Sequence, residues 1–303
     1  MSWTFKERLT FKAHDNYVIK TKFMPEKPIL VTSGMDNVIK LWSIPKWEEM
    51  LTLKGHENAV NNFDFLNYDR FLVSVSTDKS LKKWDLRTQE LVWSVHAHAK
   101  TVIGISVSPD GTKIATSSYD GHMKIWDAES GEMLAEYADF PKNLTNVCFL
   151  PDGKHIVGGG LAEELYIWDI EAGNLIHKIP AHEKAVRNIY YNPQYDVLIT
   201  AGADKRLKQW NIHDWTVKAE IELPAKGVYP ISVNRKGDLM AVGCEKRIGI
   251  YTFPEMKLLQ YFWVDVKGVY GLDFSQDSKY LAVGCTNKKV TIWQILSEHD
   301  KLR

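Results

Sequence analysis

The segment from 97 to 127 contains the side chains of a hydrolytic triad. His98 could act as a general base, the hydroxyl of Thr116 as a nucleophile, and Asp120 could orient the imidazole. A single set of this kind would predict acyl transfer. However, a histidine, a hydroxyl and an aspartate recur at the same spacing three more times along the chain. An enzyme needs one active site, so this repetition favours a structural role.

An aromatic residue recurs along the chain at an almost constant interval. Successive members lie 42, 42, 42, 42, 41 and 42 residues apart; they are Trp42, Trp84, Trp126, Trp168, Trp210, Tyr251 and Trp293. Each stands near the end of a segment that alternates as a half-buried strand does, such as "MKIWD" at 123–127. Three further short apolar segments, separated by turn signals such as "SPDG" at 108–111, complete each unit.

A unit of about 42 residues with four short antiparallel strands has the size of one propeller blade. We therefore predict an all-β, seven-bladed β-propeller with four antiparallel strands per blade, in which residues 1–303 form one domain. The sixth unit is one residue shorter, and comparison of "AVGCEKRIGIY" with "AVGCTNKKVTIW" places the deletion in the turn before its aromatic strand. "ERLTFKAH" at 7–14 matches "EMLTLKGH" at 49–56, so residues 1–12 are expected to complete the seventh blade and close the ring.

Composition narrows the class of protein. Lys and Arg number 38, as do Asp and Glu, so the net charge is zero, whereas nucleic-acid-binding domains are usually basic. Cys148, Cys244 and Cys285 form no CxxC pair, so we expect no disulfide framework, no metal site and a reducing compartment, which predicts a cytoplasmic location. We find no signal-peptide pattern and no run of 18 apolar residues that would predict a membrane span. No cofactor is expected.

The recurring polar residues resemble the motif of the WD-repeat (WD40-type) β-propeller family, and the resemblance covers essentially the whole chain. The motif consists of Gly-His or Ala-His, a Ser or Thr, an Asp, and Trp-Asp; the histidine pairs stand at 13–14, 55–56, 97–98 and 181–182. The resemblance implies a tetrad within a blade, in which Trp donates to Ser or Thr, the hydroxyl bonds to His, and His bonds to Asp. The implied tetrads are His14, Thr32, Asp36 and Trp42; His56, Ser74, Asp78 and Trp84; His98, Thr116, Asp120 and Trp126; and His182, Thr200, Asp204 and Trp210. A buried indole N–H or imidazole needs such partners whatever the family.

Three units depart from this motif. The fourth has Phe140, Gly158 and Ala162 in place of the histidine, hydroxyl and aspartate, and three consecutive glycines in a strand weaken it. The sixth has Ala241 at the hydroxyl position, and the seventh has Val283. We expect these blades to rely on packing, and the fourth to be the least protected against hydrogen exchange.

In the propeller that the resemblance implies, the narrower face is the usual docking surface. Five consecutive units carry a lysine at the same register before the innermost strand; these are Lys100, Lys142, Lys184, Lys226 and Lys267. Tyr229, Tyr270 and Tyr17 are expected side by side on this face, with Arg187 one blade away and Tyr119 just before a turn aspartate. Aromatic residues and arginine are common interface anchors, and a partial ring of lysines would favour an acidic peptide or another anion.

The function predicted from these features is a non-catalytic scaffold or adaptor, monomeric as the propeller unit, that binds proteins or peptides on the narrower face. Binding of an anion or nucleic acid through the lysine-lined face is the alternative, against which the neutral total charge weighs. A catalytic site in a central channel is the remaining alternative. The innermost strands offer it only the acids Asp64 and Asp273 and no histidine, so no catalytic residues are predicted.

Overall fold

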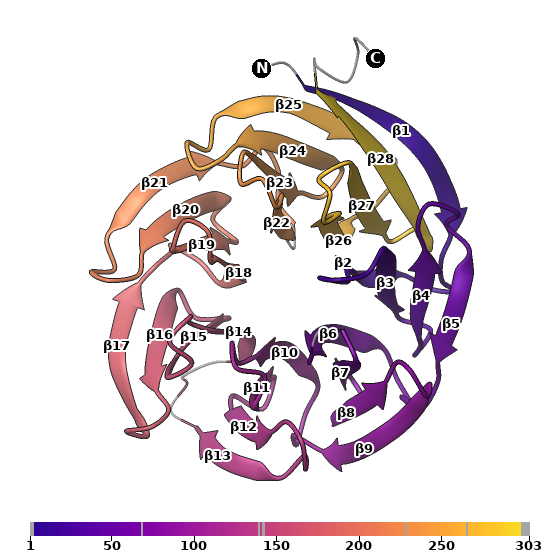
Figure 1. The fold of residues 1–303 in the computed structure, drawn as a ribbon. Helices are drawn as coiled ribbons and strands as arrows, with labels where there is room; N and C mark the ends of the chain where they lie inside the picture. Colours follow the sequence, from indigo (N-terminus) through magenta and orange to yellow (C-terminus); the bar gives the residue numbers. More distant parts are fainter. Residues whose placement is uncertain are drawn as a thin grey trace. The chain divides into compact units, whose positions relative to one another are not determined.

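A computed structural model describes residues 3–67, 69–138, 140, 143–227, 229–264 and 266–297. These residues form seven four-stranded antiparallel sheets (Figure 1). The protein is therefore all-β, a seven-bladed β-propeller with four strands per blade, which confirms the fold predicted from the repeat. By its contacts the chain divides into two compact units, Met1–Lys54 with Gly227–Arg303, and Gly55–Lys226. No helix in the described part is long and apolar enough to cross a membrane.

The first unit, Met1–Lys54 with Gly227–Arg303, holds three blades. Blade one consists of β2 (Val18–Phe23), β3 (Ile29–Gly34), β4 (Ile39–Ser43) and β5 (Glu49–Leu53). Blade six consists of β22 (Ile231–Val233), β23 (Leu239–Gly243), β24 (Arg247–Thr252) and β25 (Leu258–Trp263). Blade seven consists of β26 (Val269–Phe274), β27 (Tyr280–Cys285), β28 (Lys289–Ser297) and β1 (Trp3–Lys12).

The second unit, Gly55–Lys226, holds the other four blades. Blade two consists of β6 (Val60–Leu66), β7 (Phe71–Ser76), β8 (Ser80–Asp85) and β9 (Glu90–His96). Blade three consists of β10 (Val102–Val107), β11 (Lys113–Ser118), β12 (Met123–Asp127) and β13 (Met133–Tyr137). Blade four consists of β14 (Leu144–Phe149), β15 (His155–Gly160), β16 (Glu164–Asp169) and β17 (Asn174–Pro180). Blade five consists of β18 (Val186–Asn192), β19 (Val197–Gly202), β20 (Arg206–Asn211) and β21 (Val217–Glu222).

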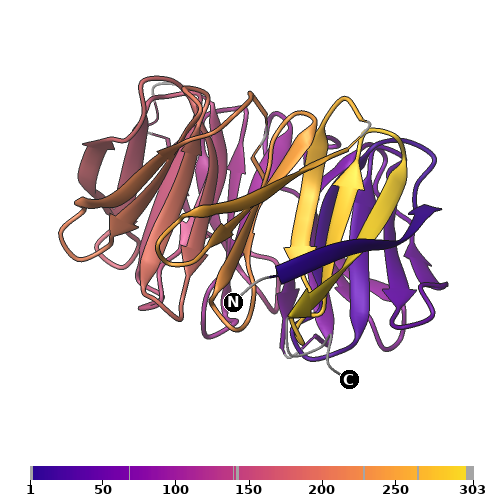
Figure 2. The same ribbon diagram turned by 90° about the horizontal axis from the view of Figure 1, so that it is seen from above.

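The two ends of the chain meet in blade seven. β1 pairs antiparallel with β28, from Trp3 opposite Ser297 to Lys12 opposite Lys289, with one irregularity between Glu7 and Leu9. Figures 1 and 2 both show these two strands side by side. The prediction that an N-terminal strand completes the last blade is thus confirmed for the described residues, which begin at Trp3.

Neighbouring blades within a unit bury each other's faces. β7 and β19 are buried along their whole length rather than on alternate residues, as expected for strands covered on both sides. Between blades two and three, Val75 and Leu81 pack in one cluster with Val102, Ile114 and Trp126. The apolar segments of the repeat therefore form inter-blade cores.

Register locates the missing residue of the sixth unit. Gly243 pairs with Ile248 across the turn between β23 and β24, whereas Gly284 pairs with Val290 in blade seven, so the turn in blade six is one residue shorter. The deletion lies where the sequence predicted it. The same register corrects one assignment: Met240 pairs with Tyr251, so the hydroxyl position of blade six, two residues further on, is occupied by Val242 and not by Ala241.

Blade four replaces the tetrad with aromatic packing. The ring centroid of Phe140 lies 4.4 Å from that of Trp168 and 5.2 Å from that of Tyr166. At Gly160, a Cβ atom would lie 2.2 Å from the carbonyl oxygen of Asn143, so the close approach of two strands requires glycine there. Packing thus stabilises this blade without the chain of polar bonds.

We expect β15 of blade four to exchange its amide hydrogens faster than β11 of blade three. The tetrad of blade three fixes β11 by directional hydrogen bonds that blade four lacks, and the three glycines of β15 lose more conformational entropy on folding than the equivalent Thr116, Ser117 and Ser118 do. Hydrogen exchange followed by mass spectrometry on peptides from the two strands measures the difference. If blade four is the slowest-exchanging blade, the expectation is wrong.

Candidate functional site

The polar residues of blade one form a continuous chain of hydrogen bonds. The indole Nε1–H of Trp42 donates to Thr32 Oγ1 at 2.9 Å. Thr32 Oγ1 lies 2.8 Å from His14 Nε2, and His14 Nδ1 lies 2.8 Å from Asp36 Oδ1. Since Thr32 Oγ1 accepts from Trp42, it donates to Nε2, and Nδ1–H donates to the carboxylate. The bonds link β3, β4, the turn between them and the loop before β2.

The same chain recurs in blades two, three and five, within the other unit. The indole of Trp84, Trp126 or Trp210 donates to the hydroxyl of Ser74, Thr116 or Thr200 at 2.8–2.9 Å. The histidine Nε2 lies 2.7–2.9 Å from that hydroxyl in His56, His98 and His182. The histidine Nδ1 lies 2.8–3.1 Å from the nearest carboxylate oxygen of Asp78, Asp120 or Asp204. All four sets implied by the sequence motif are thus hydrogen-bonded tetrads.

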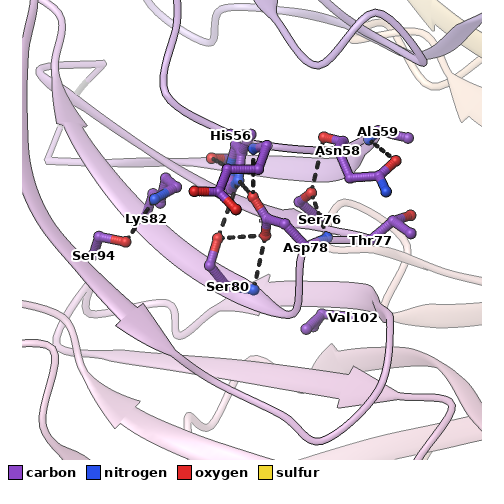
Figure 3. Close-up of polar contacts among 12 residues, drawn as sticks. His56, Asn58, Ala59, Ser76, Thr77, Asp78, Ser80, Lys82, Ser94 and Val102 are labelled. Atoms are coloured by element: carbon purple, nitrogen blue, oxygen red, sulfur yellow. Dashed lines mark hydrogen bonds and ion pairs between the residues drawn. The ribbon is translucent and has the colours of Figure 1, made fainter.

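In each tetrad the carboxylate also fixes the backbone around it. In blade two, Asp78 accepts from the amide of Glu57 at 3.0 Å and from the amide and hydroxyl of Ser80 at 2.9 and 2.5 Å. Figure 3 shows His56 and Ser80 lying against this carboxylate, with Ser76 bonded to the backbone of Asn58 nearby. The loop that carries the histidine and the turn that carries the aspartate are therefore held together.

These contacts leave no catalytic capacity in the residues that resembled a triad. His98 and Thr116 are 1% and 0% exposed, so substrate cannot reach them. The Thr116 hydroxyl already binds both Trp126 and His98, and both nitrogens of His98 are occupied. The geometry supports the structural role that the repetition of the set favours.

Burial sets the protonation of the tetrads. Desolvation lowers the pKa of His98 to about 4, although the neighbouring carboxylate of Asp120 opposes this shift. The pKa of His182 is lowered for the same reason. Burial on its own would raise the pKa of Asp120, but the ring of His98 and the amides of His122 and Ala99 outweigh it and hold that pKa below its usual value. At neutral pH each of these two blades therefore holds a neutral imidazole beside a carboxylate.

The candidate binding residues of the first unit do not all reach the surface. Lys267 is exposed, and Tyr17 and Tyr270 are half-buried. Tyr229 is 0% exposed, so the expectation that its ring lies on the docking face is wrong. Its backbone is left-handed, with φ of 55°, and Pro230 follows it, so β22 starts only at Ile231 and the register of the other innermost strands does not hold here. The ring of Tyr270 folds back toward the backbone of Gly268: a Cβ atom added to this glycine would lie 3.1 Å from the tyrosine ring.

The candidate binding residues of the second unit are exposed. Lys100 and Lys184 follow the tetrad histidines by two residues, and Lys226 and Arg187 are exposed as well. Tyr119 is 39% exposed, beside the turn of Asp120. Lys142 lies outside the described residues. Lys100, Lys184, Lys226 and Arg187 form no ion pair with any residue in the ranges that the structure describes.

The acids of the innermost strands bind backbone groups of neighbouring blades. In the second unit, Asp64 accepts from the amide of Val107 at 3.1 Å. In the first unit, Asp273 accepts from the amide of Phe23 at 2.8 Å and from the hydroxyl of Ser232 at 2.7 Å. Sequence reasoning considered these acids only for catalysis. Asp64, Ser232 and Asp273 occupy the same position of the repeat, and each has a short polar side chain. Sequence reasoning missed this signal. Across the described ranges, no group of three or more His, Cys, Asp or Glu side chains could hold a metal ion.

Stability should fall as the pH is lowered below 6.5, because His98 is protonated near pH 6.5 in the unfolded chain but only near pH 4 in the folded one. The contribution of His98 to the free energy of unfolding is complete above pH 6.5. It is lost as the pH falls toward 4, at about 1.4 kcal/mol per pH unit, or about 3 kcal/mol in total. Urea unfolding followed by tryptophan fluorescence at pH 7 and pH 4.5 measures the loss. The His98→Gln variant should lose less over this interval, and equal losses in both proteins would contradict the assignment.

Blade seven offers a matched test of the tryptophan–hydroxyl bond. Val283 stands at the hydroxyl position, and the buried Nε1 of Trp293 has no partner in the described part of the chain. Trp126→Phe should therefore cost about 1 kcal/mol more in unfolding free energy than Trp293→Phe, since only the first leaves a buried hydroxyl without its donor. Urea unfolding at pH 7 compares the two variants, and equal costs would show that the bond contributes nothing net.

Comparison with known proteins agrees with this geometry. The family model described as "WD domain, G-beta repeat" matches residues 5–43, 47–85, 89–127, 173–211 and 262–294. The unmatched stretches between them hold most of blades four and six, where the tetrad is missing. No curated protein matches the chain significantly. Because the matched segments cover more than half of its length and four of its blades carry the motif as hydrogen-bonded tetrads, the chain belongs to the WD-repeat (WD40) family.

Proposed function

We propose that this protein is a non-catalytic scaffold that binds partner proteins or peptides at the blade ends that carry the tetrad aspartates. WD-repeat propellers commonly serve as protein-interaction scaffolds. The observation that carries the proposal is a set of exposed basic side chains at these blade ends, with tyrosines beside them. Lys100, Lys184 and Tyr119 adjoin loops or turns that the tetrads hold in place, whereas Lys226 and Lys267 belong to blades six and seven, which have no tetrad. A protein of this kind positions its partners and performs no chemistry on them.

The tetrads support binding because they fix the backbone that presents these side chains. In blade three, Asp120 accepts from the amide of Ala99 at 2.9 Å and from that of His122 at 3.0 Å. Lys100 follows Ala99 directly, and Tyr119 precedes Asp120. A partner that docks here meets loops that are already ordered, so less conformational entropy is lost on binding.

Charge favours an acidic partner. Lys100, Lys184, Arg187 and Lys226 in the second unit, and Lys267 in the first, are exposed and form no ion pair with the residues described. Unpaired cations attract an acidic segment from a distance and raise its rate of capture at low salt. Tyr17 and Tyr270 in the first unit, and Tyr119 in the second, add aromatic surface of the kind that anchors interfaces.

The same lysines support a second candidate, the binding of an anion or a nucleic acid. The zero net charge of the chain weighs against nucleic acid, because such binding draws on a basic surface and releases counterions. The cytoplasmic location expected from the cysteines stays a prediction.

Charge reversal tests the proposal once affinity purification and mass spectrometry have identified a partner. Changing Lys184, Lys226 and Lys267 together to Glu should weaken its binding at least tenfold and reduce the dependence of Kd on salt between 50 and 200 mM. The control changes Lys46, Lys236 and Lys279 to Glu, which lie in turns at the opposite ends of their blades, and should leave Kd unchanged. Unchanged binding by the first variant would overturn the proposal, and filter binding of single-stranded DNA at the two salt concentrations tests the nucleic-acid alternative.

A further inference from the structure

The outer strand of blade six carries an exposed apolar stripe. β25 is the free edge of its sheet, and Tyr261 and Trp263 alternate along it, so their side chains share one face. Leu259 precedes them at an irregularity of the pairing with β24. Leu259 is 42% exposed and Trp263 is 67% exposed, the highest value among the large hydrophobic side chains in the described ranges. An apolar stripe on an open edge strand is unusual, because such an edge can pair with another chain.

The other six outer strands carry no aromatic side chain at the positions of Tyr261 and Trp263, whereas an exposed apolar side chain at the position of Leu259 is common to most blades, as in Met50, Val92, Leu134 and Ile176. At the position of Tyr261, cross-strand register places Thr10, Thr52, Ser94, Glu136, Lys178 and Glu220. At the position of Trp263 the repeat places Lys12, Lys54, His96, Ala138, Pro180 and Glu222. Charged side chains and proline are the residues with which proteins protect an edge strand from pairing. Blade six alone has an aromatic side chain at both positions, and blade two, which also lacks a charged residue or proline there at neutral pH, has the small or polar Ser94 and His96 instead.

Arg247, which lies beside the stripe, also lacks, within the described ranges, the oppositely charged partner that the equivalent residue has in blades four and five. The Arg247 guanidinium stacks over the Trp263 ring, 4.1 Å from its centroid. At the equivalent position of blade five, Arg206 pairs with Glu220 at 2.8 Å, and in blade four Glu164 pairs with Lys178 at 3.2 Å. Arg247 forms no such pair with the residues that the structure describes, since Tyr261 stands where Glu220 would be. The stacking orients the guanidinium and leaves its N–H donors for another carboxylate.

We infer that β25 binds an extended acidic segment of a partner protein as an additional strand of blade six. Backbone groups of the segment pair with the free edge of β25, which supplies affinity without sequence preference. An apolar side chain of the segment packs against Trp263 as a cross-strand neighbour, and a carboxylate binds Arg247. The exposed Lys246 next to Arg247 adds a second positive charge. The site lies on β25, on the β23–β24 turn and on the start of β24 in blade six, a blade without a tetrad, and none of its residues belongs to the docking surface proposed above.

The test selects random twelve-residue peptides displayed on phage against the full chain. The enriched peptides are expected to place an acidic residue two positions from an apolar one, because alternate residues share a face of the added strand. Synthetic copies labelled with fluorescein should bind the Trp263→Ala and Arg247→Glu variants at least tenfold more weakly than the wild type, and Arg247→Lys should retain part of the affinity. His96→Ala, at the position of Trp263 in blade two, is the matched control and should bind as the wild type does.

Three outcomes would overturn the inference. They are a selection that yields no peptide sensitive to Trp263, enrichment of basic instead of acidic peptides, and sedimentation showing that two copies of this chain associate through β25 and separate in Trp263→Ala. Trp263 is largely exposed, so its variant should fold, which circular dichroism and thermal melting verify. The variant with Glu at 184, 226 and 267 should bind the selected peptides normally, which separates failure of this site from failure of the proposed docking surface.

Discussion

A buried polar group is costly unless it finds a hydrogen-bond partner inside the protein, and the tetrad provides such partners for several groups together. The indole of Trp42, the hydroxyl of Thr32, the imidazole of His14 and the carboxylate of Asp36 satisfy one another in sequence. Each group left unpaired would cost about 1–3 kcal/mol, so the four are stable only as a set. The bonds also join the loop that precedes a blade, which carries the histidine, to the turn within the blade that carries the aspartate. Because this loop and this turn are held in place, the exposed residues next to them are ordered as well.

The blades without a tetrad show what replaces it. Blade four fills the space with Phe140 against Trp168 and Tyr166. Blade six has Tyr251 in place of the tryptophan, its hydroxyl 3.4 Å from that of Tyr261. Blade seven keeps Trp293, with the Nε1–H unpaired among the described residues and the ring stacked on Phe262 at 4.7 Å. The frame therefore tolerates loss of the polar chain where aromatic area makes up for it.

Sequence reasoning recovered the features that depend on period and pattern. The interval between tryptophans predicts the blades because strand and turn lengths set it, and the tetrads follow because their members stand at fixed offsets. It failed where the local backbone departs from the repeat. Tyr229 was placed on the surface by counting residues, but Pro230 changes the course of the chain and the ring is buried. The stripe on β25 was not foreseen either, because it becomes visible only when the residue opposite each side chain is known.

The pairing of β1 with β28 has a consequence for synthesis. Trp3–Lys12 has its partner in residues 289–297, which are made only after all the other blades. Until then Trp3–Lys12 cannot take its native place, and blade seven lacks its outermost strand. Blade seven therefore stays incomplete until residues 289–297 have been synthesised. A nascent chain that stalls before residue 289 leaves Trp3–Lys12 without its partner and free to pair with another chain, so the synthesis of β28 removes a risk of aggregation.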